Sequence, residues 1–254
     1  MKRVVITASF VIAALVIGLG VPVHGAAATG TIKGVVKMTG PVPPNPRIRM
    51  GGDPLCAISA RGSGKQPVQE IVVVGSDKGL ANTFVDLAGS FAGAPPASKD
   101  PVIIRQKGCV FTPRVVGVRV GQPLRFVNSD TLVHDVHSMS TKNAFNYTQP
   151  KSGSVNDYTP KASDLMLRLK CDVHSWMTGY VGVESHPYFA VTGADGTFTI
   201  ANVPAGRHTI RTWHERYGSL TQVVTVKPGE TATVDFAYKG TEKPVAKLAL
   251  LLVP

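Results

Sequence analysis

Leu165–Met177 reads Leu-Met-Leu-Arg-Leu-Lys-Cys-Asp-Val-His-Ser-Trp-Met, and this segment carries the strongest structural signal in the chain. Its leucines recur at every second position up to Lys170, which is the periodicity of a β-strand. The same parity places Cys171 on the face of the leucines, so we expect its sulfur to point into a hydrophobic interior. Cys171, His174 and Met177 then follow at intervals of three residues, which predicts that one tight loop carries all three.

A second histidine, His134, lies upstream in the sequence His-Asp-Val-His. One thiolate, two imidazoles and a thioether are the ligands of a mononuclear copper site that transfers electrons. We therefore predict that one copper ion is bound by His134, Cys171, His174 and Met177. A zinc ion bound by the cysteine and the two histidines, with an open fourth position, is the alternative. His137 is expected to face the other way, because it lies three residues further along a strand.

Other segments also have the pattern of short strands. Val115–Val120 alternates its valines, Gly121-Gln122-Pro123 is typical of a turn, and Leu124–Val127 continues with the same period of two. The sequence has no Gly-x-Ser-x-Gly elbow and no His-Glu-x-x-His motif, so it shows no hydrolase signature. We expect a protein that is not an enzyme.

These motifs together resemble the cupredoxins of the plastocyanin and amicyanin type. The resemblance covers roughly residues 102–185, and its Cys-x2-His-x2-Met loop is most similar to that of amicyanin. It implies a Greek-key β-sandwich, one type 1 copper ion, and His134 rather than His137 as the upstream ligand. The motifs that carry it are Phe111-x-Pro113, Val116–Val120, Gly121-Gln122, Asn128-Ser129-Asp130, His134 and Cys171-x2-His174-x2-Met177.

Some positions depart from the pattern of that family, and others exclude related classes of copper protein. Asp135 stands where these proteins usually have an asparagine that ties the ligand loops together, so the surroundings of the metal are expected to differ. Ser175 occupies the place of the second cysteine of a binuclear copper centre. Lys170 and Asp172 stand where multicopper oxidases have histidines that lead to a trinuclear cluster.

Segments on both sides of residues 101–185 resemble the transthyretin-like, carboxypeptidase regulatory-like β-sandwich. The resemblance rests on the Gly30–Val36 segment and on Asp195-Gly196-Thr197-Phe198-Thr199-Ile200 with Val203-Pro204-Ala205-Gly206. The Asp195-Gly196 pair also predicts a β-hairpin. We thus expect an all-β chain in which a cupredoxin sandwich is inserted in, or packed on, a second sandwich. The predicted division is a signal peptide at 1–28, N-terminal strands of the second sandwich at 29–100, the cupredoxin-like domain at 101–185, the remaining strands at 186–240, and an apolar tail at 241–254.

The N-terminus indicates export from the cytoplasm. Met1-Lys2-Arg3 precedes an apolar run that ends near Ala26-Ala27-Ala28, which is typical of a signal peptide; an uncleaved membrane anchor is the alternative. We predict a periplasmic or secreted protein without a stable membrane span after cleavage. Removal of Lys2 and Arg3 lowers the formal charge from +11 to +9. A basic exported redox protein suits an acidic redox partner, such as a c-type cytochrome or a dehydrogenase, and not a nucleic acid.

The chain has three cysteines. If Cys171 binds a metal, Cys56 and Cys109 remain to form a disulfide in an oxidising compartment. The function predicted from all these features is a periplasmic type 1 copper protein that carries single electrons. A copper storage or delivery module, or an envelope interaction module without electron transfer, is the alternative.

Overall fold

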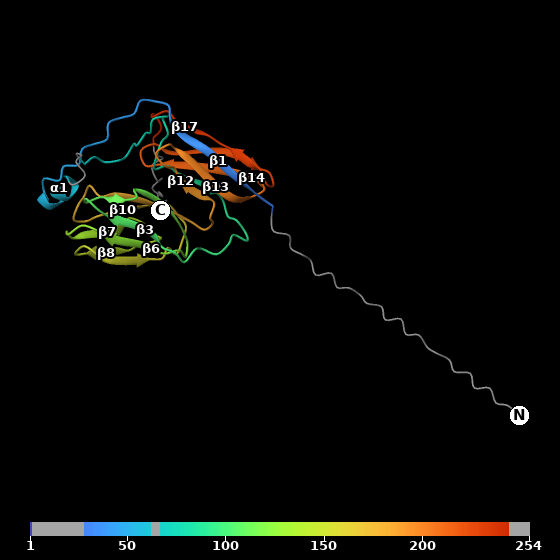
Figure 1. Cartoon of the computed structure of the whole chain (residues 1–254), viewed down its shortest axis with the longest axis horizontal. Helices are drawn as coiled ribbons and strands as arrows, with labels where there is room; N and C mark the ends of the chain where they lie inside the picture. Colours follow the sequence, from blue (N-terminus) through green and yellow to red (C-terminus); the bar gives the residue numbers. More distant parts are fainter. Residues whose placement is uncertain (2–27, 62–66, 244–254) are drawn as a thin grey trace, which may run out of the picture.

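The computed structural model describes Met1, residues 28–61 and residues 67–243, and these are almost entirely β-structure (Figure 1). Most of the predicted signal peptide (1–28) and of the predicted apolar tail (241–254) lies outside the described residues. Within the described part of the chain, no helix has the length and apolar character that a membrane span needs.

The middle of the chain forms one β-sandwich. Its two sheets have the strand orders β5-β11-β10-β7-β8 and β4-β3-β6-β9, and their inner faces bury residues such as Phe126, Leu169 and Val181. The predicted strands on either side of Gly121 are present, and that glycine has a φ of 84°, as a tight turn requires. The strands are β3 (Val102–Gln106), β4 (Phe111–Thr112), β5 (Val115–Arg119), β6 (Leu124–Asn128), β7 (His134–Ser138), β8 (Asn146–Gln149), β9 (Val155–Tyr158), β10 (Asp164–Lys170) and β11 (Thr178–Glu184).

A second sandwich is built from both ends of the described chain. One sheet has the order β13-β1-β16, with β17 also paired to β1, and the other has the order β12-β2-β14-β15. Its core is separate from the first and contains Ile32, Leu87 and Ile210. The predicted fold class is confirmed in that the chain is all-β, with one sandwich inserted between the strands of a second one. The strands are β1 (Thr29–Met38), β2 (Phe84–Ala88), β12 (Phe189–Val191), β13 (Thr197–Pro204), β14 (Gly206–His214), β15 (Gly218–Val226), β16 (Thr231–Thr233) and β17 (Phe236–Tyr238).

Strand β10 has the predicted alternation. Leu167, Leu169 and Cys171 are 2%, 0% and 2% exposed, so the cysteine does lie on the buried face of the leucines. The strand begins irregularly, with a register shift between Asp164 and Leu167 and a positive φ at Met166. The regular half of β10 is thus the half that leads into the ligand loop.

The prediction of a β-hairpin at Asp195-Gly196 is wrong. The pair does form a turn, in which Gly196 has a φ of 75° and Asp195 Oδ1 accepts a hydrogen bond from the Thr197 N–H. However, β12 before the turn pairs with β2, whereas β13 after it pairs with β1 in the opposite sheet. The turn therefore links two sheets, because burial of Phe198, Ile200 and Val203 of β13 in the second core outweighs the local hairpin preference.

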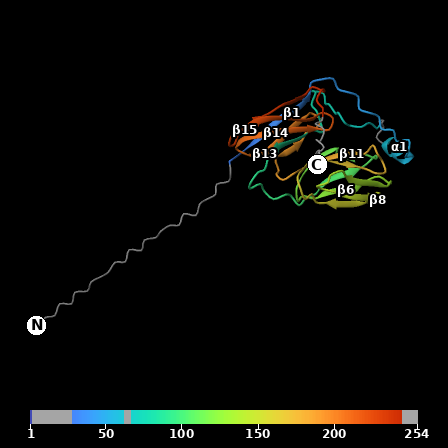
Figure 2. The same cartoon turned by 180° about the vertical axis from the view of Figure 1, so that it is seen from behind.

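The one helix of the described residues, α1 (Pro54–Arg61), lies at the end of the first sandwich (Figures 1 and 2). Ile48, Met50, Cys56 and Ala60 pack into the core of that sandwich. These apolar side chains therefore cover the end of the first sandwich rather than that of the second.

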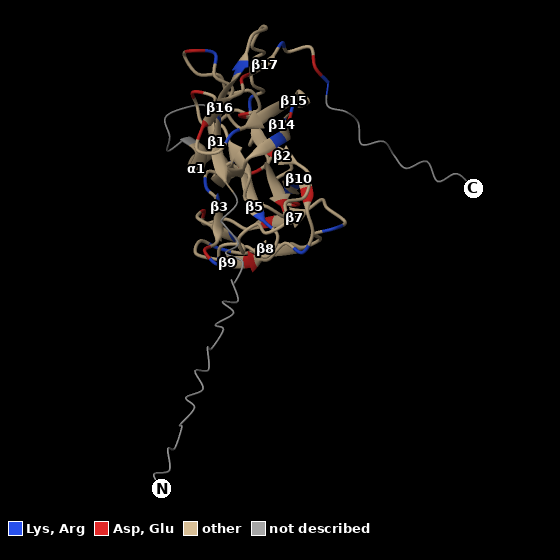
Figure 3. Cartoon of the chain, turned by 90° about the vertical axis from the view of Figure 1, so that its right-hand side faces the viewer, with Lys and Arg blue, Asp and Glu red and all other residues tan. Residues whose placement is uncertain are grey.

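Charged residues link the two sandwiches and are otherwise dispersed. Arg114, between β4 and β5, forms a two-pronged ion pair with Glu215, which follows β14; the N–O distances are 2.5 and 2.9 Å. Both side chains are largely buried, so the pair fixes one relative placement of the sandwiches. Basic and acidic segments are mixed over both sandwiches (Figure 3).

Candidate metal centre

Antiparallel pairing of β7 with β10 places the predicted ligands together. His137 pairs with Lys170 and Ser138 with Leu169, so the chain beyond Lys170 runs beside the start of β7. His134 is the first residue of β7, and Cys171 and His174 lie in the loop directly after β10. Sheet register thus brings the upstream histidine to the loop.

The donor atoms of these three residues converge in the interior. Nδ1 of His134 lies 3.0 Å from Nδ1 of His174, and that atom lies 3.9 Å from Sγ of Cys171. The donor atoms of the three residues all lie within 4.8 Å of one another. Each of the three side chains is buried, with an exposed fraction of at most 2%.

These separations fit one metal ion. Zinc, a metal with the same ligand types, has metal–nitrogen distances of about 2.0–2.1 Å and metal–sulfur distances of about 2.3 Å. Two donors of one ion are then at most about 4.1–4.4 Å apart. The observed 3.0 and 3.9 Å lie within that limit. Soft sulfur together with imidazole is the chemistry of a copper site, and the zinc alternative uses the same three donors.

Met177 and His137 take different positions around this cluster. Met177 is fully buried in the first core, and its backbone N–H donates to the His174 carbonyl (2.9 Å), which closes the loop into a turn. His137 is part-exposed, and its Nδ1 lies 2.8 Å from Oδ2 of Asp172. His137 is therefore engaged on the outer face of β7, as the strand alternation predicts.

The environment of Cys171 favours its thiolate. Sγ accepts hydrogen bonds from the backbone N–H groups of Asp135 (3.2 Å) and His174 (3.4 Å). Burial alone would raise the pKa of this thiol, but interaction with His134 and these backbone donors lower it below its usual value. The thiolate is the form in which cysteine binds a metal.

The backbone of Asp135 thus ties the two ligand loops together, a task that its side chain does not perform. Its carboxylate atom Oδ1 is buried and has no hydrogen-bond partner among the residues that the structure describes. The hydrogen bond from its N–H group to Sγ of Cys171 is a main-chain link between β7 and the loop after β10.

The outer nitrogen of each histidine meets a carboxylate. Nε2 of His134 lies 3.0 Å from Oδ2 of Asp130, and Nε2 of His174 lies 3.0 Å from Oδ2 of Asp53. Burial alone would raise the pKa of Asp130, but hydrogen bonds from His134 and from nearby N–H groups lower it to about 2. Burial alone would lower the pKa of His134, but in the metal-free protein the contacts with Asp130 and Cys171 raise it to about 9.

Neither carboxylate was predicted as part of the site. Asp130 lies four residues before His134, a spacing that could have indicated it, whereas Asp53 is far away in the sequence and carries no such signal. The predicted disulfide between Cys56 and Cys109 is confirmed, and Sγ of Cys56 lies 3.5 Å from Nε2 of His174. Cys171 is the remaining free cysteine.

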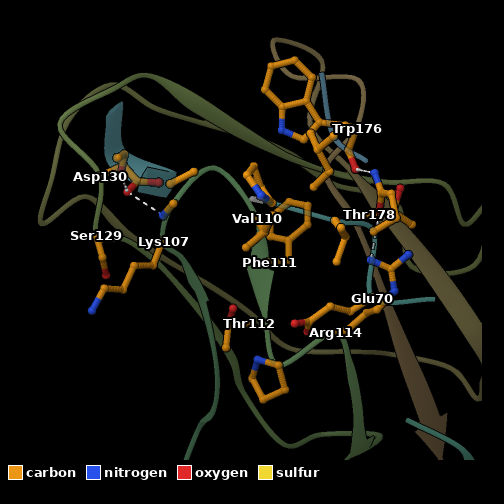
Figure 4. A pocket seen from close by; sticks show the side chains of 18 of the residues that line it. Glu70, Lys107, Val110, Phe111, Thr112, Arg114, Ser129, Asp130, Trp176 and Thr178 are labelled. Atoms are coloured by element: carbon orange, nitrogen blue, oxygen red, sulfur yellow. Dashed lines mark hydrogen bonds between the residues drawn. The ribbon is translucent and has the colours of Figure 1, made fainter. Parts of the chain in front are cut away.

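A cavity of about 920 Å³ lies beside the cluster, and Trp176 is one of its walls (Figure 4). The indole ring centroid is 5.1 Å from that of His174, and its Nε1 donates to the Cys109 carbonyl (3.0 Å). The carbonyl of Trp176 accepts a hydrogen bond from Gln69 (2.7 Å). Val110, Phe111, Lys107, Arg114 and Glu70 also line the cavity.

Several solved structures are similar to part of this chain. A purple cupredoxin from Nitrosopumilus maritimus is 18% identical, with 32% of this chain and 98% of that chain covered and a TM-score of 0.29. A copper(I) form of an amicyanin variant is 18% identical, with 39% and 98% covered and a TM-score of 0.30. A copper-containing nitrite reductase from Thermus scotoductus SA-01 is 24% identical, with a TM-score of 0.30. That match covers 37% of this chain but 24% of the reductase, so the chain spans about a quarter of the reductase's length.

No curated protein sequence matches the chain significantly. Residues 181–239 match the carboxypeptidase regulatory-like domain family. The matched range begins within β11 and extends through β17, so it contains the C-terminal strands of the second sandwich.

Proposed function

We propose that this chain is a type 1 copper protein that carries single electrons, with His134, Cys171 and His174 as the strong ligands and Met177 as the weak axial one. The observation that carries the proposal is the convergence of a cysteine sulfur and two histidine Nδ1 atoms in the interior of a β-sandwich. Bound copper would supply the one-electron couple between its two oxidation states.

The residues around the site would keep its geometry constant. The sulfur is held by two backbone N–H groups, and each imidazole is held by a carboxylate. A site whose ligands are fixed from outside rearranges little when its charge changes. Because His134, Cys171, His174 and Met177 are all buried, bulk water is also kept from the site.

Burial of the ligands favours electron transfer over the alternative of copper delivery. A protein that hands copper to another must let the partner reach the metal ligands, and here none of the four is more than 2% exposed. Trp176, in contrast, is partly exposed in the cavity and adjoins His174. We propose that a redox partner, such as a c-type cytochrome or a dehydrogenase, exchanges electrons through this indole.

The cellular location follows from the same proposal. The predicted N-terminal export signal and the Cys56–Cys109 disulfide both suit an oxidising compartment, so the protein would act in the periplasm or outside the cell. We propose no enzymatic activity and no nucleic-acid partner.

Reversible redox titration of the copper-loaded protein tests the proposed function. A carrier takes up and releases one electron per copper ion without loss of the metal. It also accepts an electron from a reduced c-type cytochrome rapidly, on the time scale that a stopped-flow experiment measures. Loss of copper on reduction, or transfer of copper to an acceptor protein without electron exchange, would instead support storage or delivery.

A further inference from the structure

Both nitrogen atoms of each histidine in the candidate centre are engaged. The Nδ1 atoms face each other across 3.0 Å, and each Nε2 lies 3.0 Å from a carboxylate oxygen. An ionised carboxylate only accepts hydrogen bonds, so a neutral imidazole, which is the form that binds a metal, carries its proton on Nε2. That tautomer leaves the Nδ1 lone pairs directed toward each other and toward Cys171.

Asp130 is held rigidly for this contact. Its carboxylate accepts hydrogen bonds from the N–H groups of Gly108 (2.8 Å) and Cys109 (2.9 Å) and from Ser59 Oγ (3.0 Å), besides the one from His134. The residue is 4% exposed. A buried carboxylate with four donors is ionised and has little freedom to turn.

Asp53 reaches His174 from outside the strands of the sandwich. Its Oδ1 accepts hydrogen bonds from the N–H groups of Leu55 (3.0 Å) and Cys56 (3.2 Å) at the start of α1, while Oδ2 faces His174. The disulfide and the Ser59–Asp130 hydrogen bond fasten α1 to the sandwich. The start of α1 therefore closes the outer edge of His174, which is 2% exposed.

We propose that Asp53 and Asp130, called here the outer carboxylates, are positioning residues that fix the tautomer of both ligand histidines and favour the more highly charged state of a bound metal. This inference rests on the proposed function. It adds that a carboxylate of the same chain holds each ligand imidazole in place. Two negative charges beside the imidazoles stabilise Cu(II) more than Cu(I), because Cu(II) carries one more positive charge.

Metal affinity of single variants tests the proposal. Loss of a carboxylate behind a ligand histidine typically weakens metal binding about 10- to 100-fold. We expect Asp53→Asn and Asp130→Asn to weaken Cu(II) binding by such a factor and Cu(I) binding by less. Asp157→Asn is the matched control, since that carboxylate is 44% exposed on β9 and pairs with Arg125 away from the cluster.

A second readout does not depend on copper. In the Zn(II)-loaded protein, each Nε2–H should exchange slowly with solvent and give a resolved nitrogen–proton NMR signal. Asp53→Asn should speed the exchange of the proton of His174 alone, and Asp130→Asn that of His134 alone. Ser59→Ala removes one donor from Asp130 without touching His134, so it measures the structural contribution of that network.

Asp53→Asn keeps the test decisive if Asp130→Asn fails to fold, because Asp53 is partly exposed and asparagine can still cap α1. The proposal is overturned if Asp53→Asn binds Cu(II) and Zn(II) as tightly as Asp157→Asn does and the NMR signals are unchanged. A wild-type protein that binds Zn(II) with protected Nε2–H groups, yet shows no reversible copper chemistry, would refute the proposed function and leave the outer carboxylates supported.

Discussion

Gly182 of β11 lies against the ring of Phe84 from β2, at the junction of the two sandwiches. A Cβ atom on Gly182 would lie 2.4 Å from Cζ of Phe84, a distance that real side chains do not tolerate. Gly117, which pairs with Gly182 in the sheet, leaves no more room, since its Cβ would lie 2.4 Å from Phe189. Two paired glycines thus admit two stacked phenylalanine rings and let the sandwiches approach closely.

Gly182→Ala should therefore destabilise the protein. Forcing a methyl group into this packed junction is expected to lower the free energy of unfolding by about 1–3 kcal/mol, measured by denaturant titration. Gly51→Ala is the control, because no atom of the described part of the chain lies within 4 Å of a Cβ at that position, and it should change the free energy by less than about 0.5 kcal/mol. Equal stabilities of the two variants would contradict this account of the junction.

The Cys56–Cys109 disulfide should stabilise the fold substantially. It joins residues 53 positions apart, and removal of a native disulfide typically costs about 2–5 kcal/mol. The Cys56→Ser, Cys109→Ser double variant should show that loss in equilibrium unfolding. Thiol titration of the denatured, metal-free, non-reduced wild type should find one free thiol, that of Cys171; three free thiols would show that the bridge does not form.

Glu184 should make stability depend on pH. Burial, and then the nearby carboxylate of Asp86, raise the pKa of Glu184 from 4.5 to about 7, and Arg211 only partly opposes this. The folded state then holds a proton that the unfolded state releases. Stability from this group is thus present below about pH 4.5 and is lost as pH rises through about 7.

Replacement of Glu184 isolates this effect from the other titrating groups. Between pH 4.5 and about pH 7, the wild type should lose about 1–3 kcal/mol more of its free energy of unfolding than Glu184→Gln does. The difference between the two curves of stability against pH measures this effect. Glu230→Gln, at a carboxylate that is 62% exposed, is the control. Parallel curves for wild type and Glu184→Gln would contradict the assignment.

Trp176→Leu should slow electron exchange without changing the metal site. The indole is the cavity residue whose ring adjoins His174, and loss of an aromatic anchor in a docking surface costs about 2 kcal/mol or more. We expect the second-order rate constant with a c-type cytochrome to fall by roughly tenfold or more, with an unchanged optical spectrum. Val223→Ala, at an exposed apolar residue of the second sandwich, is the control and should leave the rate constant unchanged. An unchanged rate constant for Trp176→Leu as well would show that the partner docks elsewhere.

The parts of the fold that the sequence predicts are those that local pattern and ligand chemistry determine. The leucine alternation before Cys171 places its sulfur correctly, and the assignment of Cys171 to a metal leaves Cys56 and Cys109 for the disulfide that the structure shows. Asp195-Gly196 shows the limit of local pattern, because which strands pair across that turn depends on the cores of both sheets.

The outer carboxylates show a second limit. Asp53 reaches His174 across 121 positions in the sequence, through a helix that a disulfide fastens over the end of the sandwich. No spacing rule predicts such a contact, since it arises from the packing of Ile48, Met50 and Cys56 on a core whose strands begin far downstream. The ligands follow from a motif, whereas the groups that hold them follow from tertiary structure.

The central claim is that Sγ of Cys171 and Nδ1 of His134 and His174 bind one copper ion. Titration of the metal-free protein with Cu(II), followed by optical and electron paramagnetic resonance spectroscopy, tests it most directly. We predict one equivalent bound with an intense visible charge-transfer band from thiolate to copper, and loss of that band in Cys171→Ser. Stoichiometric binding without colour, or a band that persists in Cys171→Ser, would contradict the account.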